Sequence, residues 1–171
     1  MGLHRQYARL SPAALQRSRS DPAWAQKRLD DLADAWAYEE PLPPEEAPYF
    51  SIEKSWDKLH YLLRAHGGMT IDVIHGGAEL PLDDETDFGP ARYLTPSEVA
   101  EAGAFLAATP FDDLARHYDL PAMLAAEIYL VPAAEADVPF DLDALRCRYD
   151  ELTRFFGAAA KAGDAVVLML T

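Results

Sequence analysis

The residues with the clearest capacity for chemistry lie together in one short segment, from Trp56 to Tyr61, which also holds Asp57. Trp56 and His60 are four residues apart, so they would share one face of a helix. An indole next to an imidazole could form an aromatic pocket in which His60 accepts or donates a proton. The alternative is a structural role, in which Trp56 packs at the edge of the core against a His60 that bonds to a backbone carbonyl.

A second polar group, Arg92 and Tyr93, stands just before Thr95, where a helix is expected to begin. The free backbone N–H groups of a helix N-terminus attract anions. Arg92 and Tyr93 could therefore bind an anion at this place. The alternative is an ion pair between Arg92 and one of the many acidic side chains of the chain.

Known metal-binding and nucleophile motifs are absent from the sequence. The five histidines lack the HExxH spacing of a helical zinc site, although a site assembled from His66, His75 and a carboxylate of residues 83–85 stays open. Cys147 lies between two arginines, whose charge favours a thiolate, but no histidine or helix cap stands beside it. GxSxG, Walker A and GxGxxG patterns are also missing. We therefore expect no catalytic residue, metal or cofactor, and a non-catalytic role is favoured over an enzymatic one.

The charge of the chain is strongly negative and unevenly distributed. The 171 residues include 15 basic and 29 acidic side chains, for a net charge of −14, which disfavours nucleic-acid binding. Residues 1–36 hold 6 basic and 4 acidic groups (+2), so the rest holds 9 basic and 25 acidic groups (−16). The acidic part could dock a basic protein partner, or it could be an ordinary solvated surface.

Several features favour a cytoplasmic protein. No segment approaches the roughly 20 apolar residues of a membrane helix, so no membrane association is expected. The N-terminus lacks the apolar stretch of a signal peptide. A single cysteine fits a reducing compartment. The oligomeric state is left open between a monomer and a homodimer.

Four pairs of a capping residue and proline predict where helices begin. They are Ser11-Pro12, Asp21-Pro22, Thr95-Pro96 and Thr109-Pro110. A short polar side chain accepts a hydrogen bond from a free backbone N–H group, and proline fits the first helical position. Glu98, three residues after Thr95, extends that pair to a capping box.

Apolar periodicity predicts the longer helices and the strands. A helix is expected from residue 22 to near Tyr38, another over 51–65, and a long one from Asp141 to Gly163. The Glu/Pro-rich run 39–48 is typical of an exposed connector, residues 83–87 of an exposed acidic loop, and 67–92 could be strand or loop.

Residues 165–170 are apolar throughout, which predicts a central strand buried on both faces, with residues 3–10 as its partner. The expected fold is thus α+β: one mostly helical domain over residues 1–171, with a small sheet that contains the N- and C-terminal strands.

Two motifs resemble those of the YfbM-like family, a bacterial domain of unknown function. They are Trp56-Asp57-Lys58-Leu59-His60-Tyr61-Leu62-Leu63 and the run from Phe88 to Val99. The opening Met1-Gly2 and the closing helix and strand of residues 149–170 are similar too, whereas 39–48 and 127–139 depart from the family pattern. The resemblance implies a compact α+β domain of the bacterial cytoplasm and no established activity.

The resemblance also implies a site, because the matched signature positions are polar or aromatic. If the start of the Thr95 helix packs near the Trp56 helix, both motifs line one cleft for a small-molecule ligand or substrate. The candidate ligand-binding residues are then Trp56, Asp57, His60, Arg92 and Tyr93.

Overall fold

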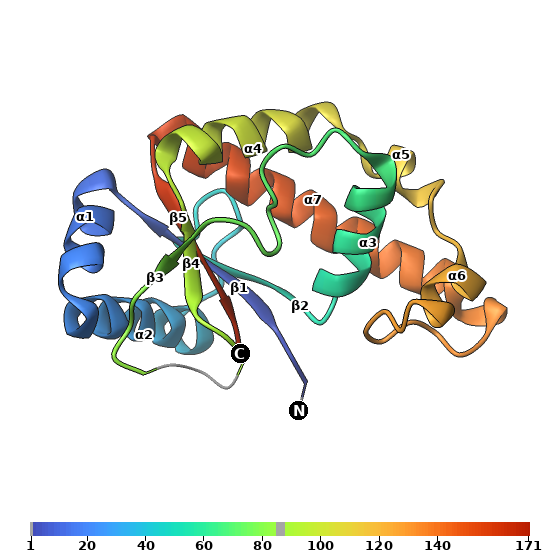
Figure 1. The fold of residues 1–171 in the computed structure, drawn as a ribbon, viewed down its shortest axis with the longest axis horizontal. Helices are drawn as coiled ribbons and strands as arrows, with labels where there is room; N and C mark the ends of the chain where they lie inside the picture. Colours follow the sequence, from blue (N-terminus) through green and yellow to red (C-terminus); the bar gives the residue numbers. More distant parts are fainter. Residues whose placement is uncertain (1, 85–87) are drawn as a thin grey trace.

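In the computed structural model, which describes residues 2–84 and 88–171, the chain folds into a five-stranded sheet with helices on both faces (Figure 1). The fold is mostly helical and of the α+β class, as the sequence predicts. Its elements are β1 (Arg5–Leu10), α1 (Pro12–Ser20), α2 (Pro22–Tyr38), β2 (Tyr49–Glu53), α3 (Trp56–His66), β3 (Ala78–Leu80), β4 (Ala91–Leu94), α4 (Pro96–Ala108), α5 (Phe111–Ala115), α6 (Leu120–Ala125), the 3-10 helix η1 (Glu135–Asp137), α7 (Val138–Ala162) and β5 (Ala165–Leu170).

The sheet has the strand order β2-β1-β5-β4-β3, and every pairing is antiparallel. β5 lies at the centre and β1 beside it, with Tyr7 opposite Leu168 and Ala8 opposite Val167. The predicted pairing of the N- and C-terminal strands is therefore confirmed.

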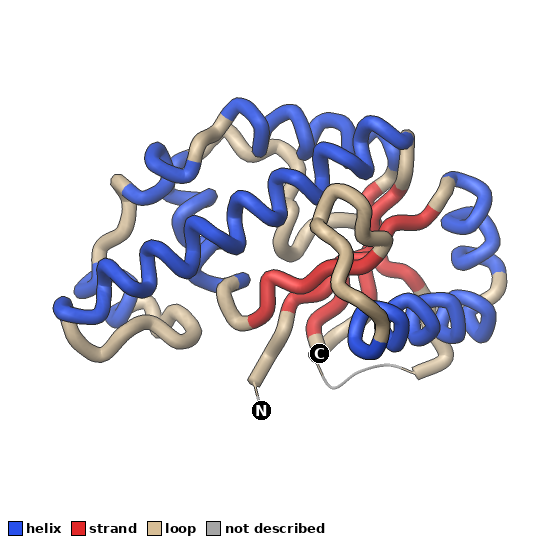
Figure 2. The backbone as a smooth tube through the Cα atoms, turned by 180° about the vertical axis from the view of Figure 1, so that it is seen from behind, coloured by secondary structure: helices blue, strands red, loops and turns tan. Residues whose placement is uncertain are grey.

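Alternation along the strands gives the sheet two different faces. Tyr7 and Leu168 point into a large core that is covered by α3, α4, α5 and α7. Ala8 and Val167 point the other way, into a smaller core that is covered by α1 and α2. Figures 1 and 2 show these two groups of helices on opposite sides of the sheet.

Three of the four predicted capping residues are confirmed. Ser11, Asp21 and Thr95 each accept a hydrogen bond from a backbone N–H group of the first turn, and Thr95 forms the predicted capping box with Glu98. A helix also begins at the fourth pair, since α5 starts at Phe111, but its cap position is Pro110 and Thr109 does not cap it as predicted. The N–H group of Thr109 still donates to Leu106 at the end of α4, and its carbonyl accepts a bond from the Tyr149 hydroxyl.

The predicted helix over 51–65 is wrong at its beginning, because residues 49–53 form strand β2 and α3 begins at Trp56. Phe50 and Ile52 fill the large core from the strand, and the backbone of β2 pairs with β1. Tertiary pairing therefore overrides a local apolar pattern that also fits a helix.

Asp141 does not cap the long helix as predicted, because α7 begins at Val138. The Asp141 carboxylate instead forms an ion pair with the buried Lys58 and accepts a bond from the Tyr118 hydroxyl. The predicted C-terminal stop is confirmed: Gly163 ends α7 in a left-handed conformation.

Residues 67–92, which the sequence left open, contain a turn over 72–77 followed by β3 and the start of β4. Of the predicted acidic loop, Asp83 and Asp84 are exposed, and 85–87 lie outside the described residues. In the described part of the chain, none of the helices combines the length and apolarity that a membrane crossing requires.

Candidate functional site

The turn over residues 72–77 carries two of the polar side chains of the candidate site. The Asp72 Oδ1 atom accepts hydrogen bonds from the backbone N–H groups of Ile74 (2.9 Å) and His75 (3.0 Å). At Gly77 the backbone has φ +96°, and a Cβ atom there would lie 2.2 Å from the Tyr93 carbonyl oxygen. Only glycine fits this place, so the turn packs directly on β4.

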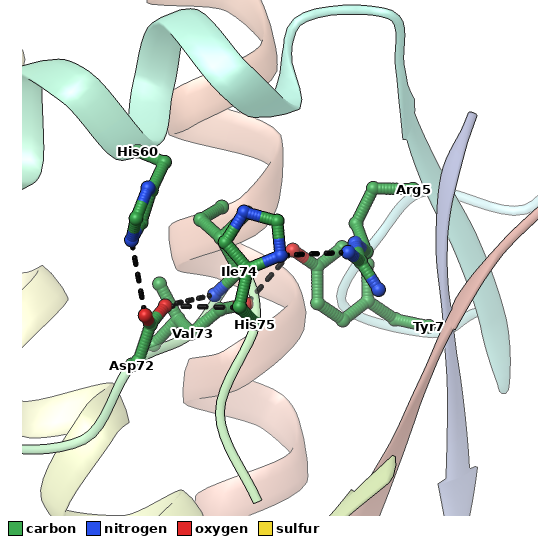
Figure 3. A network of polar contacts seen from close by, with 7 residues as sticks. All are labelled: Arg5, Tyr7, His60, Asp72, Val73, Ile74 and His75. Atoms are coloured by element: carbon green, nitrogen blue, oxygen red, sulfur yellow. Dashed lines mark hydrogen bonds and ion pairs between the residues drawn. The ribbon is translucent and has the colours of Figure 1, made fainter. Parts of the chain in front are cut away.

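Asp72 reaches from this turn to His60 on α3. Its Oδ2 atom lies 3.0 Å from the His60 Nε2 atom, so each oxygen of the carboxylate has its own partners (Figure 3). Burial of Asp72 opposes ionisation. The bonds from His60 and from two backbone N–H groups outweigh it and hold the pKa of Asp72 well below its ordinary value. A fixed, ionised carboxylate therefore orients the His60 ring.

His75, on the same turn, is held by a different partner. Its Nδ1 atom lies 2.9 Å from an Nη2 nitrogen of Arg5, a residue of β1 that is only 7% exposed. The ring centroids of His60 and His75 are 4.6 Å apart, in an edge-to-face arrangement. We call Arg5, Asp57, His60, Asp72 and His75 the histidine cluster.

The partners of the two rings determine their tautomers. An arginine can only donate, so the Nδ1 atom of His75 must accept and a neutral His75 carries its proton on Nε2. An ionised carboxylate can only accept, so His60 donates from Nε2 and, when neutral, keeps a lone pair on Nδ1. Among the described residues, neither His60 Nδ1 nor His75 Nε2 has a hydrogen-bond partner. The cluster thus presents one free acceptor and one free donor.

Burial also keeps His75 uncharged. Burial, followed by the nearby charges of Arg5 and His60, lowers the pKa of His75 to about 4. At neutral pH the ring is therefore a neutral donor through Nε2.

Aromatic side chains form one wall of the cluster. The Trp56 ring contacts the edge of His75, with centroids 5.4 Å apart, and stacks on Tyr129 at 5.8 Å. Its indole N–H group donates to the Leu3 carbonyl, and Leu3 in turn donates to the Tyr129 hydroxyl. Trp56 is thus held from both sides and positions its ring against His75.

Asp57 stands next to these groups, one turn before His60 on α3. Its Oδ2 atom accepts a hydrogen bond from the Tyr129 backbone N–H group at 2.8 Å. One ligand-type atom each of Asp57, His60 and His75 lies within 4.8 Å of the other two. The cluster therefore joins β1, α3, the 72–77 turn and the segment after α6.

Two histidines and a carboxylate at this separation could in principle hold a divalent metal ion. A metal ligand must offer a lone pair, but Arg5 leaves the free nitrogen of His75 protonated. A buried guanidinium beside the ring also repels a cation. His75 therefore does not fit as a metal ligand. The hydrogen bond from His60 to the Asp72 carboxylate, in contrast, is of the kind that orients metal-binding histidines.

The histidines of the metal site that the sequence left open have other neighbours. The ring of His66 packs against His117 with centroids 5.7 Å apart, whereas His75 packs against His60. Cys147 is exposed on α7, and its sulfur lies 3.9 Å from a carboxylate oxygen of Glu151.

The structure brings together three of the five predicted ligand-binding residues, namely Trp56, Asp57 and His60. Arg92 donates to the Gly77 carbonyl (3.0 Å) and pairs with Glu79 (3.5 Å), so it holds the end of the turn. Tyr93 is buried in the smaller core, with the Arg19 guanidinium 5.6 Å from its ring centroid. Consecutive residues of a strand point to opposite faces, so Tyr93 lies across the sheet from the cluster.

Arg5, Asp72 and Tyr129 are absent from the site that the sequence predicts, and His75 enters that prediction only as a metal ligand beside His66. A local signal for the turn stands in the run Asp72-Val73-Ile74-His75-Gly76-Gly77. An aspartate side chain often accepts a hydrogen bond from the backbone N–H two residues later, and the following pair of glycines is typical of a tight turn. No comparable local signal marks Arg5 or Tyr129.

Comparison with known proteins gives a family and a fold. The family described as Domain of unknown function (DUF1877) matches residues 1–169. A crystal structure of YfbM from Escherichia coli, titled a protein of unknown function, is similar with a TM-score of 0.66 and 15% identity, over 98% of this chain and 99% of that chain. No curated protein matches. At this identity the likeness shows the fold alone.

Proposed function

The chain belongs to the family of the Domain of unknown function (DUF1877), and we propose that it binds a small hydroxylated molecule at the histidine cluster, with His60 as the group that exchanges a proton with it. The observation that carries this proposal is the opposite hydrogen-bonding character of the two free ring nitrogens. Asp72 makes His60 Nδ1 an acceptor, and Arg5 makes His75 Nε2 a donor.

A hydroxyl group is the natural complement of such a pair. Its proton can be donated to His60 Nδ1 while its oxygen accepts the Nε2 proton of His75. An ammonium group cannot accept from His75, and a carboxylate cannot donate to neutral His60. Water or the hydroxyl of a small polar molecule satisfies both nitrogens at once.

The same arrangement supports proton transfer. When the hydroxyl proton moves to His60 Nδ1, the O–H bond breaks, an N–H bond forms, and the ring becomes an imidazolium. The ionised Asp72 carboxylate, 3.0 Å from the ring, stabilises that positive charge. His75 Nε2–H donates to the oxygen that is left with the negative charge. His60 thus acts as a general base, and the reverse step makes it a general acid.

Trp56 and Asp57 give the site its walls. The Trp56 ring, stacked on Tyr129 with the Arg5 guanidinium 6.0 Å from its centroid, gives the cluster an apolar edge beside His75 for the carbon atoms of the ligand. The Asp57 carboxylate offers a further acceptor for a second hydroxyl group. A small molecule with several hydroxyl groups therefore suits the cluster better than an apolar one.

A thermal-shift screen with glycerol, ribose, glucose, lactate and glycerate tests the proposal. We expect at least one probe to raise the melting temperature of the native protein, and His60→Ala to abolish that shift. His66→Ala is the matched control, since His66 lies on the same helix and packs on His117 outside the cluster. A shift that survives in His60→Ala, or no shift with any probe, would overturn the proposal.

A second proposal is the interaction surface expected from the acidic charge. Leu130 and Phe140 are 52% and 81% exposed, and the exposed acids Glu127, Glu135 and Asp137 lie in the same segment. Apolar groups flanked by acids suit a basic protein partner that carries apolar side chains.

A salt-dependent pull-down tests this surface with wild type, Phe140→Ser and the control Leu42→Ser, which changes an exposed apolar residue in the 39–48 connector. We expect one partner that binds wild type and Leu42→Ser at low salt, and that is lost at high salt and with Phe140→Ser. A partner retained by Phe140→Ser contradicts this surface.

A further inference from the structure

The second face of the sheet carries a cavity that the proposed function does not use. It has a volume of about 590 Å³, which lies within the usual range for small-molecule sites. Its floor is the smaller core side of the sheet, with Tyr49, Leu80 and Ala91, and its wall is α2, with Leu29 and Ala33. In Figure 2, α2 runs along this side of the sheet, across from the helices that cover the histidine cluster.

The polar groups of the cavity are mainly acceptors. The Tyr49 hydroxyl donates to the Gln6 side-chain oxygen, and the Gln26 amide nitrogen donates to Asp30 at 3.0 Å. These two bonds use the Tyr49 hydroxyl proton and one N–H of Gln26, and they leave lone pairs on the Tyr49 and Asp30 oxygens. The Gln26 Oε1 atom is buried and has no hydrogen-bond partner among the described residues. A buried acceptor without a partner is costly unless something donates to it.

The charged side chains that line the described part of the cavity are all acidic. Asp30, Glu79 and Asp84 line it, and no basic side chain is among the described lining residues. Glu79 is engaged by Arg92, so Asp30 is the acid closest to the free acceptors, one turn after Gln26 on α2. Burial, followed by the negative charge of the nearby Asp30, raises the pKa of the Tyr49 hydroxyl above its ordinary value. Asp30 therefore acts electrostatically on the floor of the cavity.

From the cavity, its unpartnered acceptor and its charge, we propose that this face binds a small organic cation: an ammonium group on an apolar body. The ammonium donates to Asp30 and to the Gln26 oxygen, and the apolar body lies against Leu29, Ala33 and Leu80. The negative charges of Asp30, Glu79 and Asp84 repel an anion, and a neutral alcohol lacks the attraction to Asp30. This site is independent of the histidine cluster and of its hydroxylated ligand.

Calorimetric titration of the native protein with a matched series of probes tests the site. The probes are hexylamine, 1-hexanol and hexanoate, which differ in charge but share an apolar body. We expect hexylamine to bind about tenfold more tightly than 1-hexanol, hexanoate not to bind, and the amine affinity to fall as salt rises. Equal binding of the amine and the alcohol, or no binding of the amine, would overturn the proposal.

Two variants distinguish the effect of the Asp30 charge from the effect of the cavity volume. Asp30→Asn should weaken hexylamine about tenfold and leave 1-hexanol unchanged, whereas Ala33→Leu fills the cavity and should weaken both probes. Asp34→Asn is the matched control, since it removes the same charge from an exposed place on α2 outside the cavity. If Asp30→Asn and Asp34→Asn weaken the amine equally, the effect is general charge attraction and the site is refuted. Ala33→Leu keeps the proposal testable should Asp30→Asn fail to fold.

Discussion

The two faces of the sheet carry opposite kinds of candidate site. On the face covered by α3, the polar side chains are fixed by partners: Asp72 holds His60, and Arg5 holds His75. On the face covered by α2, there is open volume and an oxygen of Gln26 without a partner. Fixed side chains suit proton transfer, which needs orientation, whereas an open cavity with free acceptors suits binding.

The difference also explains why the cavity alone is a poor guide to chemistry in this fold. His60, Asp72 and His75 do not line the cavity of about 590 Å³, and no histidine is among its described lining residues. The cluster is marked instead by polar groups that orient one another, Asp72 with His60 and Arg5 with His75. Variants on one face should therefore leave ligand binding at the other face unchanged.

The largest effect is expected from Gly77→Ala. A Cβ atom at this place meets the Tyr93 carbonyl at 2.2 Å, and φ is +96°, so the variant should lose about 2–4 kcal/mol of unfolding free energy. Gly163→Ala is the control, because Gly163 has the left-handed helical conformation with φ +72° and no atom within 4 Å, so the variant should cost only about 1 kcal/mol. Urea unfolding measures both, and equal losses would show that the turn does not pack on β4 as described.

A somewhat smaller effect on the free energy of unfolding is expected from His75→Gln, and this effect should depend on pH. The pKa of His75 is about 4 in the folded protein and about 6.5 when unfolded, so protons bind preferentially to the unfolded chain between these values. The stability that the neutral ring contributes is complete above about pH 6.5 and is lost as the pH falls toward 4. After allowance for partial solvent exposure, this amounts to about 2 kcal/mol.

The measurement is the difference in unfolding free energy between wild type and His75→Gln across this pH range, so that the titration of other groups cancels. The difference should shrink as the pH falls. A constant difference would contradict the account of His75, and hexylamine binding at neutral pH should be the same in both proteins.

Asp72→Asn should weaken the binding of a hydroxylated ligand by about tenfold. The asparagine oxygen can still accept from Ile74 and His75, but its amide group then faces His60 Nε2 and can only donate. His60 would have to accept there and move its proton to Nδ1, which removes the free acceptor. Titration with the best probe of the thermal-shift screen measures the loss, and an unchanged affinity would show that Asp72 does not set the tautomer.

The smallest effect is expected from Arg92→Met. This variant removes one hydrogen bond to Gly77 and an ion pair with the exposed Glu79, so the loss in unfolding free energy should be below about 1 kcal/mol. Ligand affinity at the cluster should change by less than about twofold. A tenfold loss of affinity would instead make Arg92 a ligand-binding residue, as the sequence motif implies, and would extend the site toward β3.

The parts of the fold that rest on local signals could be predicted from the sequence. Ser11, Asp21 and Thr95 satisfy free backbone groups within one turn, so their capping role is visible in three or four residues. Residues 165–170 could be placed centrally because a strand buried on both faces has no polar position. Residues 49–53 could not, since their pairing with β1 depends on a strand more than 40 residues away.

The candidate site could be predicted only where it lies on one helix. Trp56, Asp57 and His60 share α3, whereas Arg5 and His75 meet across 70 residues of chain. Nothing local marks Arg5, because its role arises from the sheet that brings β1 beside the 72–77 turn. The separation of Arg92 from Tyr93 follows from strand alternation, which becomes decisive once β4 is known to be a strand.

The central claim is that the two histidines present opposite groups to a ligand, and imidazole NMR tests it most directly. Long-range ¹H–¹⁵N spectra at about pH 8 distinguish the two tautomers of each ring. We predict that His60 and His75 both carry the proton on Nε2, and that Asp72→Asn moves the proton of His60 alone to Nδ1. A His75 ring protonated on Nδ1 would contradict the claim, because Arg5 could not then donate to it and the free donor would be lost.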